Sequence, residues 1–350
     1  MRKLNVLISG STGYMGIQLI KLLKKHKNVK IKYLCGNSSV GKKISHFDKS
    51  LNSKNLPSIV KFKKFFLKNV DLVFTALPNG EAQKLSNYLL PGNKLIDLAA
   101  DFRLTNYNNY KKWYKKEHKA KNNISKSLYS IPELNKYDLK KFKIIACPGC
   151  YPTSVLLPLI PLIKKKLILL KNIVVDSKSG YSGAGRGIHK KHKDKNLYNS
   201  LSVYGVGFHR HNSEIEQEIS KICNKNYEIS FTPHLTPMFR GIMSTIYLNL
   251  PKGITSKKIF TYLKKFYKNK KFIKFAKFNK PISTNDVINT NNCLISICKS
   301  KYKDKIIILS TIDNLIKGGS GQGIQNMNLI YNFPESRGLL WKKWFFLCFF

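Results

Sequence analysis

The first part of the chain alternates short apolar runs with amphipathic ones, a pattern that predicts strands connected by helices. Runs typical of buried strands occur at residues 4–9, 30–34, 70–77, 94–100 and 144–146. Runs with the helical spacing of apolar residues occur at 17–23 and 81–90. Residues 105–128 are polar and lysine-rich and predict a surface helix, followed by a loop at 129–135. We therefore expect an α/β fold with a doubly wound parallel sheet.

From residue 150 onward the pattern is that of a second, α+β unit. An apolar helical run covers residues 154–163, and a further helix is expected at 256–268. Strands are expected at residues 171–177, 227–232, 242–250, 293–298 and 306–311. We expect a first domain at 1–149, a second at 150–312, and a glycine-rich loop, helix and tail at 313–350 that pack back on the first domain.

A glycine motif joins the first predicted strand to the first predicted helix. Gly10, Gly13 and Gly16 have the spacing G-x-x-G-x-x-G. Strand, glycine turn and helix is the context in which this motif holds a dinucleotide at a helix N-terminus. A tight turn without a ligand is the alternative, but the context favours a Rossmann-type cofactor domain.

The end of the second predicted strand lacks the carboxylate that NAD-binding proteins use for the ribose 2′-hydroxyl. Asn37, Ser38 and Ser39 stand there instead, followed by Lys42 and Lys43. Small polar groups near lysines suit a 2′-phosphate, so we expect NADP. A plain surface loop is the alternative.

A cysteine lies at a Pro-Gly turn directly before the apolar helical run. A helix N-terminus would make the Cys150 thiol more acidic, and its free N–H groups could hold an oxyanion, as acyl transfer through a thioester requires. A buried structural cysteine is the alternative. Cys147 and Cys150 together have the Cys-x-x-Cys spacing of a redox pair, but the sequence around them is not thioredoxin-like.

Two histidines precede a predicted helix in the second unit. His211 and Glu214 are three residues apart, close enough for the carboxylate to orient an imidazole that moves protons. A zinc site is the competing interpretation of His209-x-His211, but no third ligand stands at metal spacing, and we expect no metal. Surface histidines without a role are the other alternative.

Polar residues that could bind an anion occur in a glycine- and serine-rich loop and after the predicted strands. Ser182, Gly183 and Arg186 offer backbone donors and a guanidinium to a group such as phosphate, with a flexible loop as the alternative. Pro78 and Arg103 follow predicted strands, at the edge where doubly wound sheets bind ligands.

The charge balance first suggests a nucleic-acid partner, because 63 Lys and Arg outnumber 18 Asp and Glu to give a net charge of +45. The lysines, however, are spread over every segment together with abundant asparagine, isoleucine and tyrosine. That composition is expected from AT-rich codons. We therefore expect no nucleic-acid partner, and a field that attracts small anionic substrates.

Cysteine usage and the chain ends indicate the compartment. Seven scattered cysteines, an odd number, argue for a reducing environment. The first apolar run is too short for a signal peptide, and the apolar tail at 341–350 is too short to span a bilayer. We expect a cytoplasmic protein without membrane association.

Taken together and in order, these motifs resemble the N-acetyl-γ-glutamyl-phosphate reductase family, relatives of aspartate-semialdehyde dehydrogenase. The resemblance covers nearly the whole chain and rests on Gly10-x-x-Gly13-x-x-Gly16, Asp101-Phe102-Arg103, Pro148-Gly149-Cys150-Tyr151-Pro152-Thr153, Ser182-Gly183-Ala184-Gly185-Arg186, His209-Arg210-His211, Lys317-Gly318-Gly319 and Gln325-Asn326-Met327-Asn328.

The resemblance implies NADPH-dependent reduction of an acyl phosphate through a thioester on Cys150, with His211 as acid and base and Glu214 positioning it. It implies substrate-binding roles for Arg103, Ser182, Gly183, Arg186 and His209. It implies cofactor-binding roles for Gly10, Thr12, Gly13, Tyr14, Met15, Gly16, Asn37, Ser38, Ser39, Pro78, Ser182, Gly183, Asn314 and Lys317. It further implies a dimerising second domain and a homodimer or homotetramer.

The chain departs from the family at three places. Asn79 stands where the family often has histidine, Gly319 and Gly323 replace common alanines, and the phenylalanine-rich tail is unusual. The remaining alternatives are a reductase of aspartyl or amino-blocked aminoadipyl phosphate, a decayed enzyme, and a basic nucleic-acid-binding protein built on a dinucleotide fold.

Overall fold

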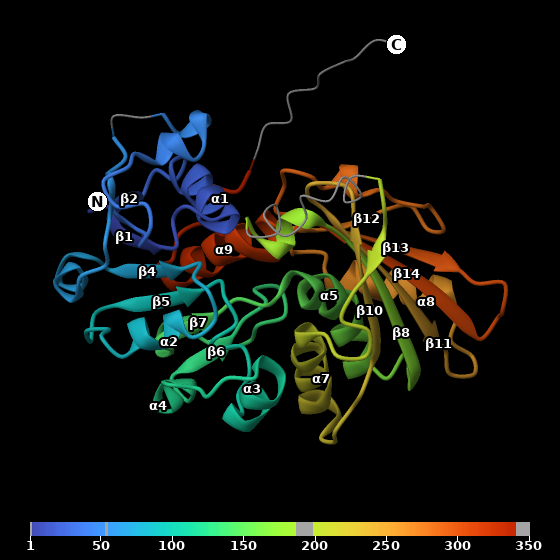
Figure 1. Ribbon diagram of the computed structural model, residues 1–350. Helices are drawn as coiled ribbons and strands as arrows, with labels where there is room; N and C mark the ends of the chain where they lie inside the picture. Colours follow the sequence, from blue (N-terminus) through green and yellow to red (C-terminus); the bar gives the residue numbers. More distant parts are fainter. Residues whose placement is uncertain (1, 53–54, 187–198, 341–350) are drawn as a thin grey trace, which may run out of the picture.

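The computed structural model describes residues 2–52, 55–186 and 199–340. Within these residues the strands form two seven-stranded sheets, with the apolar helix α5 (Cys150–Lys164) and the C-terminal helix α9 (Gly321–Ile330) between them (Figure 1). The first sheet is built from strands before residue 150 and the second from strands after it.

The first sheet is parallel throughout, which confirms the predicted doubly wound architecture. In spatial order its strands are β3 (Ile59–Val60), β2 (Val29–Cys35), β1 (Leu4–Ser9), β4 (Leu72–Thr75), β5 (Lys94–Asp97), β7 (Ile144–Ala146) and β6 (Ser127–Tyr129). The order reverses direction between β1 and β4, and a crevice for ligands forms outside the strand ends at such a point.

Helices of the first unit follow the predicted runs closely, except after residue 104. The helices α1 (Tyr14–Leu23) and α2 (Glu81–Ser86) lie where the periodicity placed them. The single surface helix predicted at 105–128 is wrong, because the segment forms α3 (Tyr107–Tyr114), α4 (Lys121–Ile124) and the start of β6. Asn106 caps α3, and Lys115 ends it in a left-handed conformation with φ 54°.

The second sheet is mixed. In spatial order its strands are β12 (Ile273–Phe275), β13 (Cys293–Lys299), β14 (Lys305–Ile312), β11 (Ile242–Asn249), β8 (Leu169–Gly180), β10 (Ser230–Thr236) and β9 (Ser202–Val203). β10 runs past the predicted end at residue 232 and through Pro233. The proline is tolerated because β9, the outer neighbour, pairs only with His234 and Leu235.

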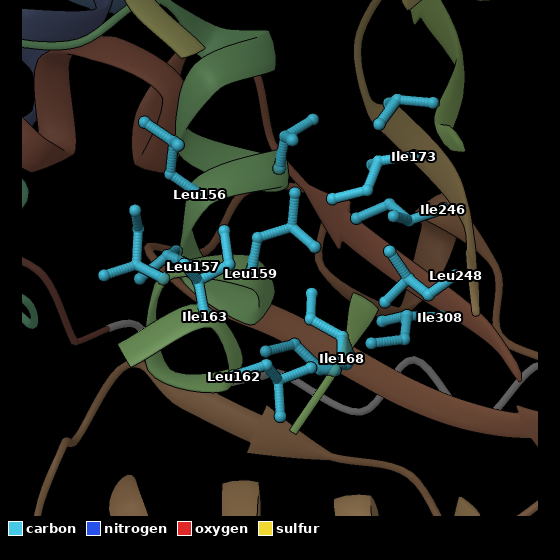
Figure 2. Packing of buried hydrophobic residues seen from close by; sticks show 14 of the residues in the cluster. Leu156, Leu157, Leu159, Leu162, Ile163, Ile168, Ile173, Ile246, Leu248 and Ile308 are labelled. Carbon is cyan, nitrogen blue, oxygen red and sulfur yellow. The ribbon is translucent and has the colours of Figure 1, made fainter. Parts of the chain in front are cut away.

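Helices α5, α7 (Arg210–Cys223) and α8 (Ser256–Phe266) pack together on one side of the second unit. Figure 2 shows the leucines of α5 in one buried cluster with Ile173, Ile246 and Ile308 of the strands. Two prolines lie inside α5, and Pro161 cannot donate to the Leu157 carbonyl as a helical residue would. The buried Tyr267 hydroxyl donates to that carbonyl at 2.6 Å instead, so the helix continues.

The C-terminal segment lies against both units. A single π-helical turn, η8 (Ile316–Ser320), leads into α9, which contacts α1 and β5, while η8 contacts α1, α5 and β14. Almost every residue of this segment is buried. The segment thus connects the strand ends of the first sheet with the start of α5. The predicted apolar tail at 341–350 lies outside the described residues.

Candidate active site

A cleft of about 1740 Å³ opens at the carboxyl ends of the first sheet and extends to the N-termini of α5 and α7. Most of the predicted site residues line it, namely Gly10, Thr12, Gly13, Tyr14, Met15, Asn37, Ser38, Pro78, Arg103, Cys150, Ser182, Gly183, Arg186, His209, His211 and Asn314. Four predicted residues, Gly16, Ser39, Glu214 and Lys317, do not reach its wall.

Cys150 is the first residue of α5, with Gly149 as the N-cap and no side chain capping the helix. Burial raises the pKa of Cys150 to about 11. The charge of Arg103 and the backbone amides of Tyr151 and Cys150, which interact with the sulfur, act in the opposite direction but are outweighed. The expectation of an acidic thiol is therefore wrong for this state, because the helix N-terminus cannot compensate for the loss of water around the sulfur.

Two glycines make unusually close approaches at this site, Gly318 to Cys150 and Gly149 to His211. A Cβ at Gly318 would lie 2.6 Å from the Cys150 Cβ, and a Cβ at Gly149 would lie 2.5 Å from His211 Nε2. Real Cβ contacts are never this short. The two glycines therefore let the π-helical turn approach the cysteine and let the imidazole lie directly against the N-cap of α5.

His211 belongs to the first turn of α7 and is mostly buried, with 17% of its side chain exposed. Its Nδ1 has no hydrogen-bond partner among the described residues, and Nε2 lies 3.9 Å from Glu214 Oε1, beyond hydrogen-bond distance. Burial lowers the pKa of His211 well below its usual value, and His209, Arg103 and Arg210 add to the effect. The imidazole is neutral and can accept a proton in the cleft.

Glu214 is fully buried beneath the cleft and connects three elements. It accepts hydrogen bonds from Arg103 Nη1 at 3.0 Å, from the Gly149 N–H at 2.8 Å and from the Tyr129 hydroxyl at 3.1 Å. The carboxylate therefore fixes the N-cap of α5 directly. Its predicted action on His211 takes the form of a contact at 3.9 Å rather than a hydrogen bond.

Arg103 lines the cleft, but its guanidinium is largely committed to the protein. Besides the bond to Glu214, Nε donates to the Cys147 carbonyl at 2.8 Å and Nη2 to the Leu98 carbonyl at 3.1 Å. Although Arg103 is paired with Glu214, its charge still lowers the pKa of both Cys150 and His211.

His209 is the N-cap residue of α7, and its Nδ1 accepts a hydrogen bond from the His211 N–H at 3.2 Å. Burial, followed by the charge of Arg210, lowers the pKa of His209 to about 4. Its ring contacts those of Tyr151, Tyr204 and His211 edge to face. His209 therefore lines the cleft as a neutral group that orients the start of α7.

The other half of the cleft has the features of a dinucleotide site. Gly10 has φ +84°, and a Cβ there would lie 2.3 Å from the Ala76 carbonyl oxygen. A Cβ at Gly16 would lie equally close to the Gly10 carbonyl oxygen, so Gly16 serves the turn rather than a ligand. No side chain caps α1, whose first turn lines the cleft. The N-terminus of α1, which faces the cleft at Tyr14 and Met15, thus suits a pyrophosphate.

At the end of β2 the structure rearranges the predicted phosphate-binding set. Asn37 and Ser38 line the cleft, whereas Ser39 is buried beside it. Lys42 and Lys43 are not part of the wall; Lys61, directly after β3, is. The backbone places it there because the Gly36 N–H bonds to the Val60 carbonyl at 3.1 Å. Sequence reasoning missed Lys61 because only strand pairing brings it next to Ser38.

The glycine- and serine-rich loop lies between the two halves. Ser182 Oγ accepts a hydrogen bond from Asn314 Nδ2 at 2.9 Å. Arg186 lies over the Tyr14 ring at 5.0 Å and donates to the Phe47 carbonyl at 3.3 Å, which places it on the cofactor half. Residues 187–198 lie outside the described residues.

The predicted cofactor contact of Lys317 is not supported by its position. Its side chain is fully buried and pairs with the equally buried Glu133 at 2.6 Å, and it donates to Gln325 Oε1 at 2.9 Å. Gln325 Nε2 in turn donates to Glu133 at 2.8 Å. Lys317 therefore stabilises the turn η8 from within the core. Nothing in the local sequence shows that Lys317 pairs with Glu133 rather than with a phosphate of the cofactor.

Further side chains to which the sequence assigned no role also line the cleft. Among them are Tyr114, Lys116, Tyr151, Tyr204 and Arg210. In the described ranges, no group of three His, Cys, Asp or Glu side chains is arranged to hold a metal ion. No helix among the described residues combines the length and the apolar character needed to cross a membrane.

Comparison with known proteins agrees with this geometry. Residues 5–142 match a family model described as semialdehyde dehydrogenase, NAD binding domain, and residues 150–314 match semialdehyde dehydrogenase, dimerisation domain. Among solved structures, aspartate semialdehyde dehydrogenase II of Vibrio cholerae superposes with a TM-score of 0.72 at 16% identity over 95% of this chain and 99% of that one. The Candida albicans enzyme solved with NADP superposes with a TM-score of 0.65 at 16% identity, covering 94% of this chain and 98% of that one.

Curated relatives are much more similar in sequence. The N-acetyl-γ-glutamyl-phosphate reductase of Desulforamulus reducens is 39% identical, covering 95% of this chain and 96% of its own length. That of Brachyspira hyodysenteriae is 41% identical, covering 96% of this chain and 98% of its own length. The chain therefore belongs to the N-acetyl-γ-glutamyl-phosphate reductase family, within the semialdehyde dehydrogenases.

Proposed function

We propose that this chain reduces N-acetyl-γ-glutamyl phosphate to N-acetylglutamate 5-semialdehyde and phosphate, with NADPH as reductant, in arginine biosynthesis. One observation carries the proposal. Cys150, at the uncapped start of α5, shares a cleft with the uncapped start of α1, and the His211 imidazole lies against Gly149, the N-cap residue of α5. A nucleophile, a proton acceptor and a dinucleotide site then serve one reaction.

Cys150 is the nucleophile in the acyl-transfer step. Its pKa of about 11 means that the resting group is a thiol, so attack requires removal of a proton. The neutral His211 accepts that proton as the C–S bond forms and phosphate leaves. The amides of Cys150 and Tyr151 both interact with the sulfur at the helix N-terminus. They therefore lie next to the substrate carbonyl that bonds to the sulfur, and they stabilise its oxygen as it becomes negative.

Return of the proton completes the cycle. When bound, NADPH supplies the hydride that reduces the thioester carbonyl. His211 then donates its proton to the departing sulfur, and the C–S bond breaks to release the semialdehyde and restore the thiol. Glu214 supports both steps by holding the Gly149 N–H and Arg103.

The preference for NADP over NAD is part of this proposal. Lys61 lies beside Asn37 and Ser38 at the cleft wall, a lysine with two small polar groups that together suit a 2′-phosphate. We expect Lys61→Glu to raise the KM for NADP⁺ by about tenfold or more and to leave the KM for NAD⁺ nearly unchanged. Equal changes for both cofactors would contradict this assignment.

Assembly and domain limits are proposed as well. The division at 149/150 and 312/313 agrees with the two sheets, and α9 packs on the first unit. No described helix packs on the face of the second sheet that carries the exposed Val174 and Tyr247, and the matching family model is described as a dimerisation domain. We propose a homodimer through this face. Tyr247→Lys should yield monomers in light scattering.

The reaction is tested in reverse, by phosphate-dependent reduction of NADP⁺ with N-acetylglutamate semialdehyde. Cys150→Ser should abolish turnover, and Cys147→Ser should retain it, because Cys147 is fully buried and bonded to Asn326. Aspartate semialdehyde and an amino-blocked aminoadipate semialdehyde serve as competing substrates. A higher kcat/KM for either one would replace the proposed substrate, and full activity of Cys150→Ser would exclude the thioester.

A further inference from the structure

At the mouth of the cleft, next to His211, two basic side chains have no acidic partner among the described residues. Arg210, the residue before His211, lines the cleft and is exposed, and Lys116 lines it from the other unit. The Lys116 ammonium donates a hydrogen bond to the Asn79 carbonyl, at 3.5 Å. No carboxylate of the described residues pairs with either cation, whereas Glu214 pairs with Arg103 close by. Positive charge is thus concentrated on the substrate side of Cys150.

A buried hydroxyl lies beneath Arg210. The Tyr114 side chain is 8% exposed and lines the cleft, its ring centroid lies 5.4 Å from the Arg210 guanidinium carbon, and its hydroxyl has no hydrogen-bond partner among the described residues. Burial raises the pKa of Tyr114, so the group is a neutral donor. A buried hydroxyl without a partner is costly, and a ligand that accepts from it would remove that cost.

The position of this pair is fixed by contacts between the two units. Gln217 of α7 accepts from the Thr105 N–H at 2.8 Å and donates to the Arg103 carbonyl at 3.1 Å. Tyr110 stacks on Tyr114 with ring centroids 4.7 Å apart. The middle of α7 is therefore held against the segment that leads into α3, and Tyr110 supports the Tyr114 ring within α3, so the surroundings of the cation and the hydroxyl are defined by packing.

We infer that Arg210 and Tyr114, assisted by Lys116, bind the α-carboxylate of the acyl phosphate substrate and so determine its specificity. The inference rests on the proposed function, because it places the reacting carbonyl at Cys150. A guanidinium and a phenol suit a carboxylate, to which Arg can donate twice and Tyr once. The reacting phosphoryl group needs room to depart, whereas the carboxylate stays bound, so fixed donors benefit the carboxylate more.

The test compares two aldehydes that differ only in this carboxylate, N-acetylglutamate semialdehyde and 4-acetamidobutanal, in the phosphate-dependent reduction of NADP⁺. We expect Arg210→Gln to lower kcat/KM for the carboxylated aldehyde by at least tenfold more than for the analogue. Tyr114→Phe should shift the same ratio by severalfold without lowering the melting temperature, because the lost hydroxyl has no protein partner. Lys112→Gln removes an exposed charge from α3, the helix that carries Tyr114, and should not change the ratio of the two kcat/KM values.

Other outcomes would overturn the inference. Equal losses with both aldehydes would assign Arg210 and Tyr114 a structural role. A raised KM for phosphate with either aldehyde would assign them to the phosphoryl group. Absence of any wild-type turnover would instead refute the proposed function. In that case protection of Cys150 against iodoacetamide still tests the subsite: N-acetylglutamate should protect better than 4-acetamidobutanoate in the wild type but not in Arg210→Gln, and equal protection in the wild type would overturn it.

Discussion

The Cα of Gly318 lies so close to Cys150 that a Cβ on it would come within 2.6 Å of the cysteine Cβ. The atom in the way is attached directly to the backbone of α5 and cannot move aside by a side-chain rotation. Gly318 belongs to the π-helical turn η8, a conformation that occurs frequently at functional sites. The turn therefore determines where the nucleophile lies.

Gly318→Ala should consequently displace Cys150 and reduce kcat by about tenfold to a hundredfold, because misplacement of a reacting group by a fraction of an ångström is costly. Steady-state kinetics and the binding constant for NADP⁺ measure the effect, and the binding constant should change little. Gly92→Ala is the matched control, since a Cβ there meets nothing within 4 Å. Unchanged kcat in Gly318→Ala would mean that the turn relaxes without moving the cysteine.

The pH dependence of alkylation reports on the state of the thiol. Burial raises the pKa of Cys150 to about 11, so the thiol predominates below that pH and the thiolate fraction rises about tenfold per pH unit. The rate of inactivation by iodoacetamide should therefore rise continuously from about pH 7 to about pH 10. A plateau near neutral pH would indicate a stable thiolate paired with imidazolium. Cys150→Ser identifies the background rate from other cysteines.

Removing one member of the buried pair of Lys317 and Glu133 should destabilise the fold. Lys317→Met leaves the Glu133 carboxylate buried without a counter-charge, and we expect a loss of about 3–5 kcal/mol in the free energy of unfolding. Urea titration followed by circular dichroism measures it. Adding Glu133→Leu should recover much of the loss. Lys111→Met breaks an exposed pair with Glu117 and should leave the urea midpoint unchanged.

Glu214→Gln tests whether the carboxylate holds the start of α5. The amide can accept on one side only, so its NH₂ group faces either Arg103 or the Gly149 N–H. We expect kcat to fall about tenfold or more, while NADP⁺ affinity stays the same because α1 is not involved. Glu218→Gln, at a partly exposed pair with Lys221 on the same helix, is the control. A larger effect on NADP⁺ affinity than on kcat would contradict this role.

The departures from the family pattern have a structural counterpart at two glycines. A Cβ at Gly319 would lie 2.4 Å from Met15 Sδ, and one at Gly323 would lie 2.7 Å from Leu98 Cδ2. Met15 and Leu98 thus fill space in which the common alanines would place their methyl groups. The sequence showed the substitutions, but only the packing shows which neighbours accompany them.

By itself, the sequence determined five strands of the parallel sheet, but not β3 or β6, together with the glycine turn before α1 and the cysteine at the start of α5. These features depend on spacing along the chain, and local spacing is what periodicity and turn chemistry report. Its limits appear where the local signal is weak: the polar segment at 105–128 divides into α3 and α4, which no apolar stripe marks.

Only the tertiary structure decided how the charged groups are used. Arg103 meets Glu214 across 111 positions, and Lys317 meets Glu133 across 184, so neither pair leaves a trace in local sequence. Lys61 reaches the cleft through the pairing of β2 with β3. The pKa of Cys150 likewise depends on how much water the assembled fold removes from the sulfur, a quantity that exists only once the two units have packed around it.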